Sequence, residues 1–168
     1  MSEETVVYEE RIDELKIFRT QAVLGLSPWI AKQRLMLEIS PAVAGVKGQP
    51  QSGEKRFEYD KKIRISFKTS HMLQFAYDLK ELIKSGKGEI KKFADMSKSV
   101  VNDSDKKTLS VIARDNGDIG FALFKGNDKV NISITKSDAY AIVKHIEFVY
   151  QYFVFSALSN GANNGNKS

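Results

Sequence analysis

The segment Lys62-Ile63-Arg64-Ile65-Ser66-Phe67-Lys68 carries the clearest structural signal in this chain. Its apolar residues alternate with basic or polar ones, which is the period-two pattern of a strand that buries one face. The sequence predicts a strand over 56–67. Ser70 then stands where a helix N-cap belongs, and apolar residues recur at helical spacing up to Gly86. A helix near residues 71–84 is therefore expected.

The chain before this segment has the pattern of further strands. β-forming residues dominate 16–26, and Pro28 is expected to interrupt them. Apolar and polar residues alternate again over 34–39, up to Pro41. Residues 44–54 are rich in Gly, Gln and Pro, which predicts a loop.

Three more strands are expected after the helix, at 107–114, 119–125 and 129–135, and residues 85–104 are expected to be irregular. Asn116-Gly117 is a strong hairpin turn signal between the first two. The stretch Thr135-Lys136-Ser137-Asp138 resembles a capping box, and a broad apolar face follows it, which predicts a last helix.

This order of elements indicates an α+β fold with mainly antiparallel sheet. A single domain is expected over residues 16–158. An acidic leader over 1–15 precedes it, and an Asn- and Gly-rich tail over 159–168 is predicted to be disordered.

The distribution of charge indicates a polyanionic partner. The net charge is +5, but residues 1–15 hold six acids and one base, so the rest of the chain carries +10. A Lys-rich surface that is only solvated explains the same numbers, and the sequence leaves both readings open. The chain begins with acidic residues and contains no long apolar run, so a soluble protein of a cytoplasm-like compartment, without a membrane partner, is expected.

The residues give little support to an enzyme. There is no cysteine, and the only histidines, His71 and His145, lack metal-ligand spacing. Gly86-Lys87-Gly88 follows a helix rather than a strand, so it is not in the context of a phosphate loop. We therefore expect no catalysis, no metal or other cofactor and no small-molecule substrate.

Three segments resemble the Whirly family of single-stranded DNA-binding proteins. Residues 35–42, Leu-Met-Leu-Glu-Ile-Ser-Pro-Ala, are similar to its second strand and the Pro that ends it. Residues 56–62, Arg-Phe-Glu-Tyr-Asp-Lys-Lys, are similar to its Tyr-Asp-Trp-Glu-Lys-Lys motif. Leu82-Ile83, with Gly86, Glu89, Phe93 and Asp95, is similar to its helix end. The resemblance covers roughly residues 16–155.

Two motifs depart from the family pattern. The family's Lys-Gly-Lys-Ala-Ala-Leu segment is replaced by residues 18–24, Phe-Arg-Thr-Gln-Ala-Val-Leu, and Tyr59 stands in place of Trp. The family's plant transit peptide has no counterpart either, and these departures indicate a bacterial, phage or other non-plant member. The resemblance implies two four-stranded antiparallel sheets, each followed by a helix. It also implies a homotetramer joined by C-terminal helices, with DNA along sheet edges between protomers.

Binding a single strand requires cations for phosphates and aromatic rings for bases. Basic, aromatic and amide residues on outward strand positions or in loops meet this requirement, although each one alone is as well explained by a solvated face or a core. Phe57 and Phe124 are further aromatic candidates, more often core, and Ser133 is a further group for base edges. The predicted contacts are Lys16, Phe18, Arg19, Gln21, Trp29, Lys32, Arg34, Tyr59, Lys62, Arg64, Arg114 and Asn131.

The last helix carries more large apolar groups than one stripe holds, so part of it is expected to face another protomer. The alternative is burial in the chain's own sheet. The predicted interface residues are Phe148, Tyr150, Tyr152, Phe153 and Phe155.

The favoured function is sequence-independent binding of single-stranded DNA in replication, recombination or repair. An RNA-binding or annealing protein, a transcription regulator of melted promoters and a purely structural scaffold are the alternatives that the sequence leaves open.

Overall fold

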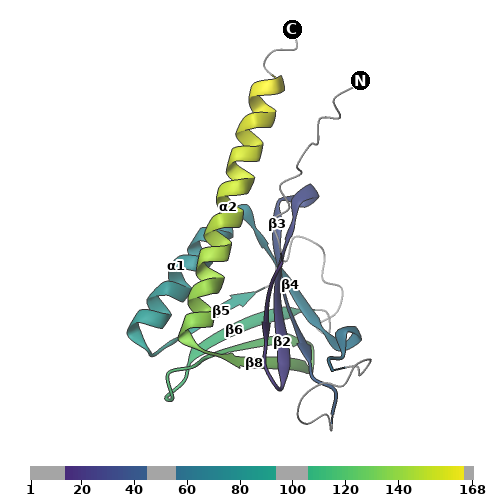
Figure 1. Cartoon of the computed structure of the whole chain (residues 1–168), viewed down its shortest axis with the longest axis vertical. Coiled ribbons are helices and arrows are strands. Elements are labelled where there is room, and N and C mark those ends of the chain that lie inside the picture. Colours follow the sequence, from purple (N-terminus) through teal and green to yellow (C-terminus); the bar gives the residue numbers. More distant parts are fainter. Residues whose placement is uncertain (1–13, 45–55, 94–105, 165–168) are drawn as a thin grey trace, which may run out of the picture.

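The fold consists of two four-stranded antiparallel sheets, each followed by a helix (Figure 1). The computed structural model describes residues 14–44, 56–93 and 106–164. The strand order is β1-β2-β3-β4 in the first sheet and β5-β6-β7-β8 in the second, which confirms the predicted fold class. The elements are β1 (Leu15–Phe18), β2 (Ala22–Trp29), β3 (Arg34–Pro41), β4 (Ile63–Lys68), α1 (Thr69–Ser85), β5 (Glu89–Phe93), β6 (Lys107–Ala113), β7 (Ile119–Lys125), β8 (Asp128–Ile134) and α2 (Lys136–Asn164).

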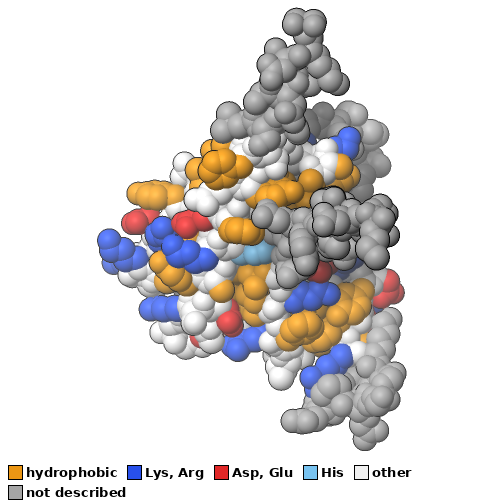
Figure 2. Space-filling model, turned by 45° about the horizontal axis from the view of Figure 1, so that its top comes forward, with side chains coloured by type: hydrophobic (Ala, Val, Ile, Leu, Met, Phe, Trp, Pro, Cys, Tyr) orange, Lys and Arg blue, Asp and Glu red, His pale blue; other side chains and the backbone are white. Residues whose placement is uncertain are grey.

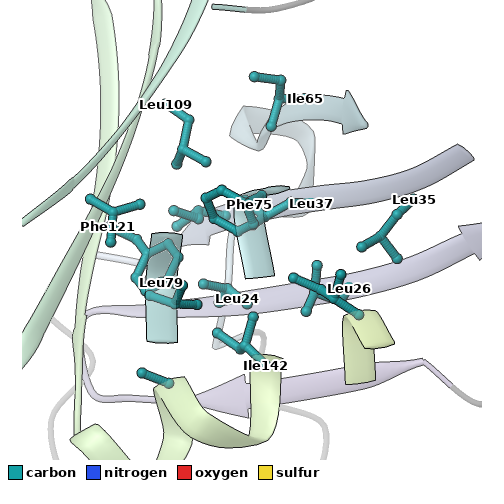
Figure 3. Packing of buried hydrophobic residues seen from close by; sticks show 14 of the residues in the cluster. Leu24, Leu26, Leu35, Leu37, Ile65, Phe75, Leu79, Leu109, Phe121 and Ile142 are labelled. Carbon is teal, nitrogen blue, oxygen red and sulfur yellow. The ribbon is translucent and has the colours of Figure 1, made fainter. Parts of the chain in front are cut away.

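The sheets and both helices share one apolar core. The strands pair in a register that aligns their apolar positions, so that Leu26, Leu37 and Ile65 lie in one row across the first sheet. Leu109 and Phe121 of the second sheet, and side chains of both helices, point into the same space (Figure 3). The two sheets run in different directions, and the end of the first lies over β8 (Figure 1).

The strand boundaries differ from the predicted ones in two places. Pro28 does not end its strand, because β2 continues to Trp29 with Pro28 opposite Leu35. β1 pairs with β2 only as far as Leu26, so no β1 residue lies opposite Pro28. The missing N–H of Pro28 therefore leaves no hydrogen bond to β1 unmade. The segment 85–104 is not wholly irregular, since β5 pairs there with β6.

The predicted strand over 56–67 begins only at Ile63. Before it, Phe57 makes an isolated bridge to Ala42, and Tyr59–Lys61 form a short 3-10 turn, η2. Backbone hydrogen bonds from Val43 N–H to the Arg56 carbonyl (2.8 Å) and from Glu58 N–H to the Pro41 carbonyl (2.9 Å) hold this segment beside the end of β3.

The helix ends agree with the sequence only in part. Lys68, not Ser70, is the N-cap of α1, and it makes no side-chain capping bond. Gly86 ends α1 in the left-handed conformation (φ 68°), as predicted. Thr135 Oγ1 accepts the Asp138 N–H at 3.1 Å at the start of α2. α2 continues to Asn164, six residues past the predicted domain end at 158.

One predicted interface residue, Phe153, belongs instead to the chain's own core, where it is 1% exposed. Between Ala139 and Phe153 the buried residues of α2 recur at helical spacing and pack in the core with the sheets. This face of α2 is therefore not accessible to another protomer. Tyr150 and Tyr152 are partly buried against the same core, while Phe148 and Phe155 are exposed. No helix in the described part of the chain is long and apolar enough to cross a membrane.

We expect the stability of this fold to fall as the pH drops through about 6.5. His145 on α2 is partly buried, its Nε2 has no hydrogen-bond partner among the described residues, and burial lowers its pKa below the usual 6.5. The unfolded chain therefore takes up a proton that the folded chain does not. Urea unfolding between about pH 7.5 and pH 5.5 measures the effect. His145→Gln should flatten this dependence, and His71→Gln, at an exposed position, should keep it. A slope unchanged in His145→Gln would contradict the assignment.

Candidate nucleic-acid interface

An aromatic row lies at one end of the outward face of the first sheet. Phe57 has Phe18 on one side, with ring centroids 5.9 Å apart, and Tyr59 on the other, at 6.2 Å. Phe57 is only 6% exposed, whereas Phe18 and Tyr59 are 58% and 44% exposed. Phe57 therefore supports its neighbours rather than offering a face of its own.

Basic side chains surround this row. Lys16 Nζ lies 5.8 Å from the centroid of the Tyr59 ring, within cation–π range. On the neighbouring strands, Arg64 donates two hydrogen bonds to Glu38 Oε2, at 2.8 and 2.9 Å, and Lys62 lies 3.5 Å from the same oxygen. One carboxylate thus orients two exposed cations, and positive charge remains on this face.

Arg19 connects the β1–β2 turn to the second sheet. Its Nε donates a hydrogen bond to the Ser133 carbonyl at 3.0 Å. Ser133 belongs to β8, an edge strand whose outer carbonyls have no strand partner in the described part of the chain. Arg19 therefore satisfies one edge carbonyl and brings a guanidinium to the junction of the sheets.

A pocket of about 750 Å³ opens at this junction. The β1–β2 turn forms one wall with Phe18, Arg19 and Gln21, and β8 forms another with Ser133. Arg56 and Phe57 supply the third wall. Side chains of this pocket therefore include an exposed aromatic ring, guanidinium donors and an amide, which are the groups that bind bases and phosphates.

Arg114 directly follows β6 and lies against Gly120 of β7. A Cβ on Gly120 would lie 2.8 Å from Arg114 Nε and 3.1 Å from Nη2, so the guanidinium rests on the bare backbone of Gly120. Gly120 is paired with Ser133, whose carbonyl holds Arg19. The two arginines therefore meet one row of the second sheet. Asn131, exposed on the same face of β8, lies two residues away.

The structure separates the other predicted contacts from this group. Trp29, Lys32 and Arg34 lie at the opposite end of the first sheet, roughly 23 Å away for a strand of this length at about 3.3 Å per residue. Trp29 is exposed, and Arg34 Nη1 donates to Ser66 Oγ at 3.2 Å. Phe124 is half-buried in the second sheet, with Lys129 Nζ 5.4 Å from its centroid.

Sequence reasoning missed three pocket residues, Thr20, Arg56 and Ile132. Arg56 is the first residue of the Arg-Phe-Glu-Tyr-Asp-Lys-Lys segment, and its positive charge could have marked it as a phosphate contact. Ile132 is a buried position of an alternating strand, and nothing in the sequence distinguishes it from other core residues. The described residues hold no cluster of three or more His, Asp or Glu side chains placed to bind a metal ion.

Comparison with known proteins identifies the fold. No protein-family profile and no curated protein sequence matches this chain. The structure is similar to the crystal structure of WHY1 from Arabidopsis thaliana, with a TM-score of 0.58, over 88% of this chain and 94% of that one. The sequence identity is 15%. The chain therefore has a Whirly-like fold, as its sequence resemblance indicated.

Arg19→Ala should lower the free energy of unfolding by about 1–2 kcal/mol, because the charged hydrogen bond that joins the two sheets is lost. Arg114→Ala is the matched control. No hydrogen bond of its side chain is found within the described residues, and a change below about 0.5 kcal/mol is expected. Urea unfolding of both variants measures the difference. Equal losses would show that the Arg19 bond does not hold the junction together.

Proposed function

We propose that this protein binds single-stranded nucleic acid, preferably DNA, without catalysing a reaction. The observation that carries the proposal is the junction pocket, whose lining includes the exposed ring of Phe18 and the guanidinium groups of Arg19 and Arg56. The exposed ring of Tyr59, with Lys16 over it, continues the aromatic row from Phe57 in the pocket wall. Stacking tolerates any base and phosphate contacts tolerate any sequence, so binding is expected to be largely sequence-independent.

The shape of the site favours a single strand. Its rings lie next to a pocket at the end of one sheet and the edge of another, where an unpaired base can insert. A duplex keeps its bases stacked inside and presents only phosphates and groove edges. The exposed amide of Asn131 and the backbone of the β8 edge can donate to or accept from base edges without imposing one sequence.

The Whirly-like fold supports the same assignment, through the single-stranded DNA binding that is characteristic of the Whirly family. A role in DNA replication, recombination or repair is the corresponding cellular proposal. RNA offers the same rings and phosphates, so RNA binding is an outcome that the experiment below must distinguish.

Tyr59→Ala should weaken binding to an oligo-dT of about 30 nucleotides by about 5- to 150-fold, since stacking contributes about 1–3 kcal/mol per base. Tyr77→Ala is the matched control, because Tyr77 is also an exposed tyrosine but lies on α1, outside the aromatic row. Fluorescence anisotropy at low and high salt measures both, with duplex and oligo-U as competitors.

Affinity should also fall steeply with salt, because bound phosphates release counterions. Equal binding of duplex and single strand, or no loss in Tyr59→Ala, would contradict the proposed site. Tighter binding of oligo-U than of oligo-dT would favour the RNA alternative.

We also propose that the protein is a homo-oligomer, a tetramer by analogy with the family, joined through α2. Tyr140, Phe148 and Phe155 are exposed along this helix, and Phe148 and Phe155 are seven residues apart and so lie on one face. The face opposite to them is buried in the chain's own core, and α2 extends beyond the sheets (Figure 1). Figure 2 shows that hydrophobic side chains are exposed at several places on the face in view, some of them beside Lys and Arg side chains.

The double variant Phe148→Ser/Phe155→Ser should be a monomer, because it removes the exposed aromatic groups of that face and leaves the core intact. Light scattering of the wild type should give a mass about four times that of the 18.9 kDa chain. Leu73→Ser/Tyr77→Ser on α1 removes two comparably exposed apolar groups and should leave the mass unchanged. A monomeric wild type would refute the interface.

A further inference from the structure

A second pocket, of about 490 Å³, lies where the β3 and β4 ends of the first sheet meet the β7–β8 turn. Four lysines from two segments line it, Lys61 and Lys62 from the end of η2, and Lys125 and Lys129 from either side of the turn. Asp60 and Asp128 are the acidic residues of its lining. We call it the lysine pocket.

Two of the four lysines have carboxylate partners on the first sheet side. Lys61 Nζ lies 3.2 Å from Glu58, and Lys62 Nζ lies 3.5 Å from Glu38. The other two, Lys125 and Lys129, are exposed and make no ion pair with any described residue. Lys129 Nζ instead lies over the Phe124 ring, 5.4 Å from its centroid. The pocket therefore presents ammonium groups whose charge its own carboxylates do not fully neutralise.

The lysine pocket and the junction pocket share strand β8. Val130 lines the first, and Ile132 and Ser133 line the second. Lys129 and Ser133 are four residues apart, which is about 13 Å along a strand. Exposed Asn131 lies between them on the outward face. β8 is an edge strand, so its outer backbone groups over this distance have no strand partner in the described part of the chain, and the carbonyl of Ser133 holds Arg19.

We propose that the lysine pocket binds backbone phosphate of the same strand whose bases occupy the junction pocket, so that the nucleic acid follows the β8 edge from Ser133 to Lys129. This inference rests on the proposed function and extends it. Lysine ammonium groups are compact charges that suit phosphate without demanding one geometry. The junction pocket supplies stacking, and the lysine pocket supplies charge and a longer footprint.

The test is the double variant Lys125→Gln/Lys129→Gln, titrated with oligo-dT of about 4 and about 16 nucleotides, the two ends of the usual footprint range. The wild type should bind the longer strand more tightly, and the variant should lose about tenfold of that gain while its affinity for the short strand stays the same. The slope of log K against log salt should fall by about 1.4, from two phosphate contacts at about 0.7 each.

Lys84→Gln/Lys87→Gln, at the end of α1 and the turn after it, removes the same charge outside both pockets and should leave the length dependence unchanged. An equal loss in this control would overturn the proposal in favour of a general charge effect. A Lys125→Gln/Lys129→Gln protein with wild-type length and salt dependence would also overturn it, and the proposed function would stand. If the wild type binds neither oligonucleotide, both fail.

Inorganic phosphate carries the same charged groups as the nucleic-acid backbone, so a separate titration must distinguish the two ligands. Inorganic phosphate is titrated into the wild type at constant ionic strength, and the amide signals of Lys129 and Val130 are followed by NMR. Weak or absent shifts, with clear shifts from the longer oligonucleotide, are expected. Saturable phosphate binding without any length dependence for DNA would assign the pocket to a free anion and overturn the strand path.

Discussion

The whole arrangement depends on the packing of two sheets against one core. Leu37 of the first sheet and Phe121 of the second are buried in the same cluster, which α1 and α2 cover. Burial of apolar surface is the main stabilising contribution to such a fold. Because the sheets run in different directions, they cannot continue each other, and the end of one must lie over the edge of the other. The outer edge of β8 therefore has no strand partner in the described part of the chain, and the β1–β2 turn lies beside it.

The candidate site is a consequence of that geometry. A turn over an open edge meets carbonyls that need donors, and Arg19 supplies one to Ser133. Beside this junction Phe18 and Tyr59 are exposed, and the buried ring of Phe57 contacts both of them. Gly120 has no side chain, which leaves room for the Arg114 guanidinium close to its backbone. The cationic and aromatic groups therefore lie close together because Arg19 hydrogen-bonds to the β8 edge and Phe57 is packed beside Phe18.

The sequence was sufficient for the fold class and for most strands, since alternation over 107–135 fixes which residues face the core. It was insufficient wherever a tertiary partner decides the outcome. Phe153 and Phe155 are both aromatic residues of one helix, and only packing against the sheets separates a buried ring from an exposed one. Likewise, Trp29 and Tyr59 satisfied the same chemical criterion, but strand register places them at opposite ends of a sheet.

The pairing of charges distinguishes cations that shape the protein from cations that can serve a ligand. Arg64 and Lys62 share Glu38, and Arg19 is held by a carbonyl, so a phosphate must compete with an existing partner at each of these three. Such groups are held in place, which reduces the entropy lost on binding but also the net gain in electrostatic energy. Lys125 and Lys129 have no carboxylate to displace among the described residues. The held cations therefore suit orientation of a strand at the junction, and the two lysines suit the salt-sensitive part of its affinity.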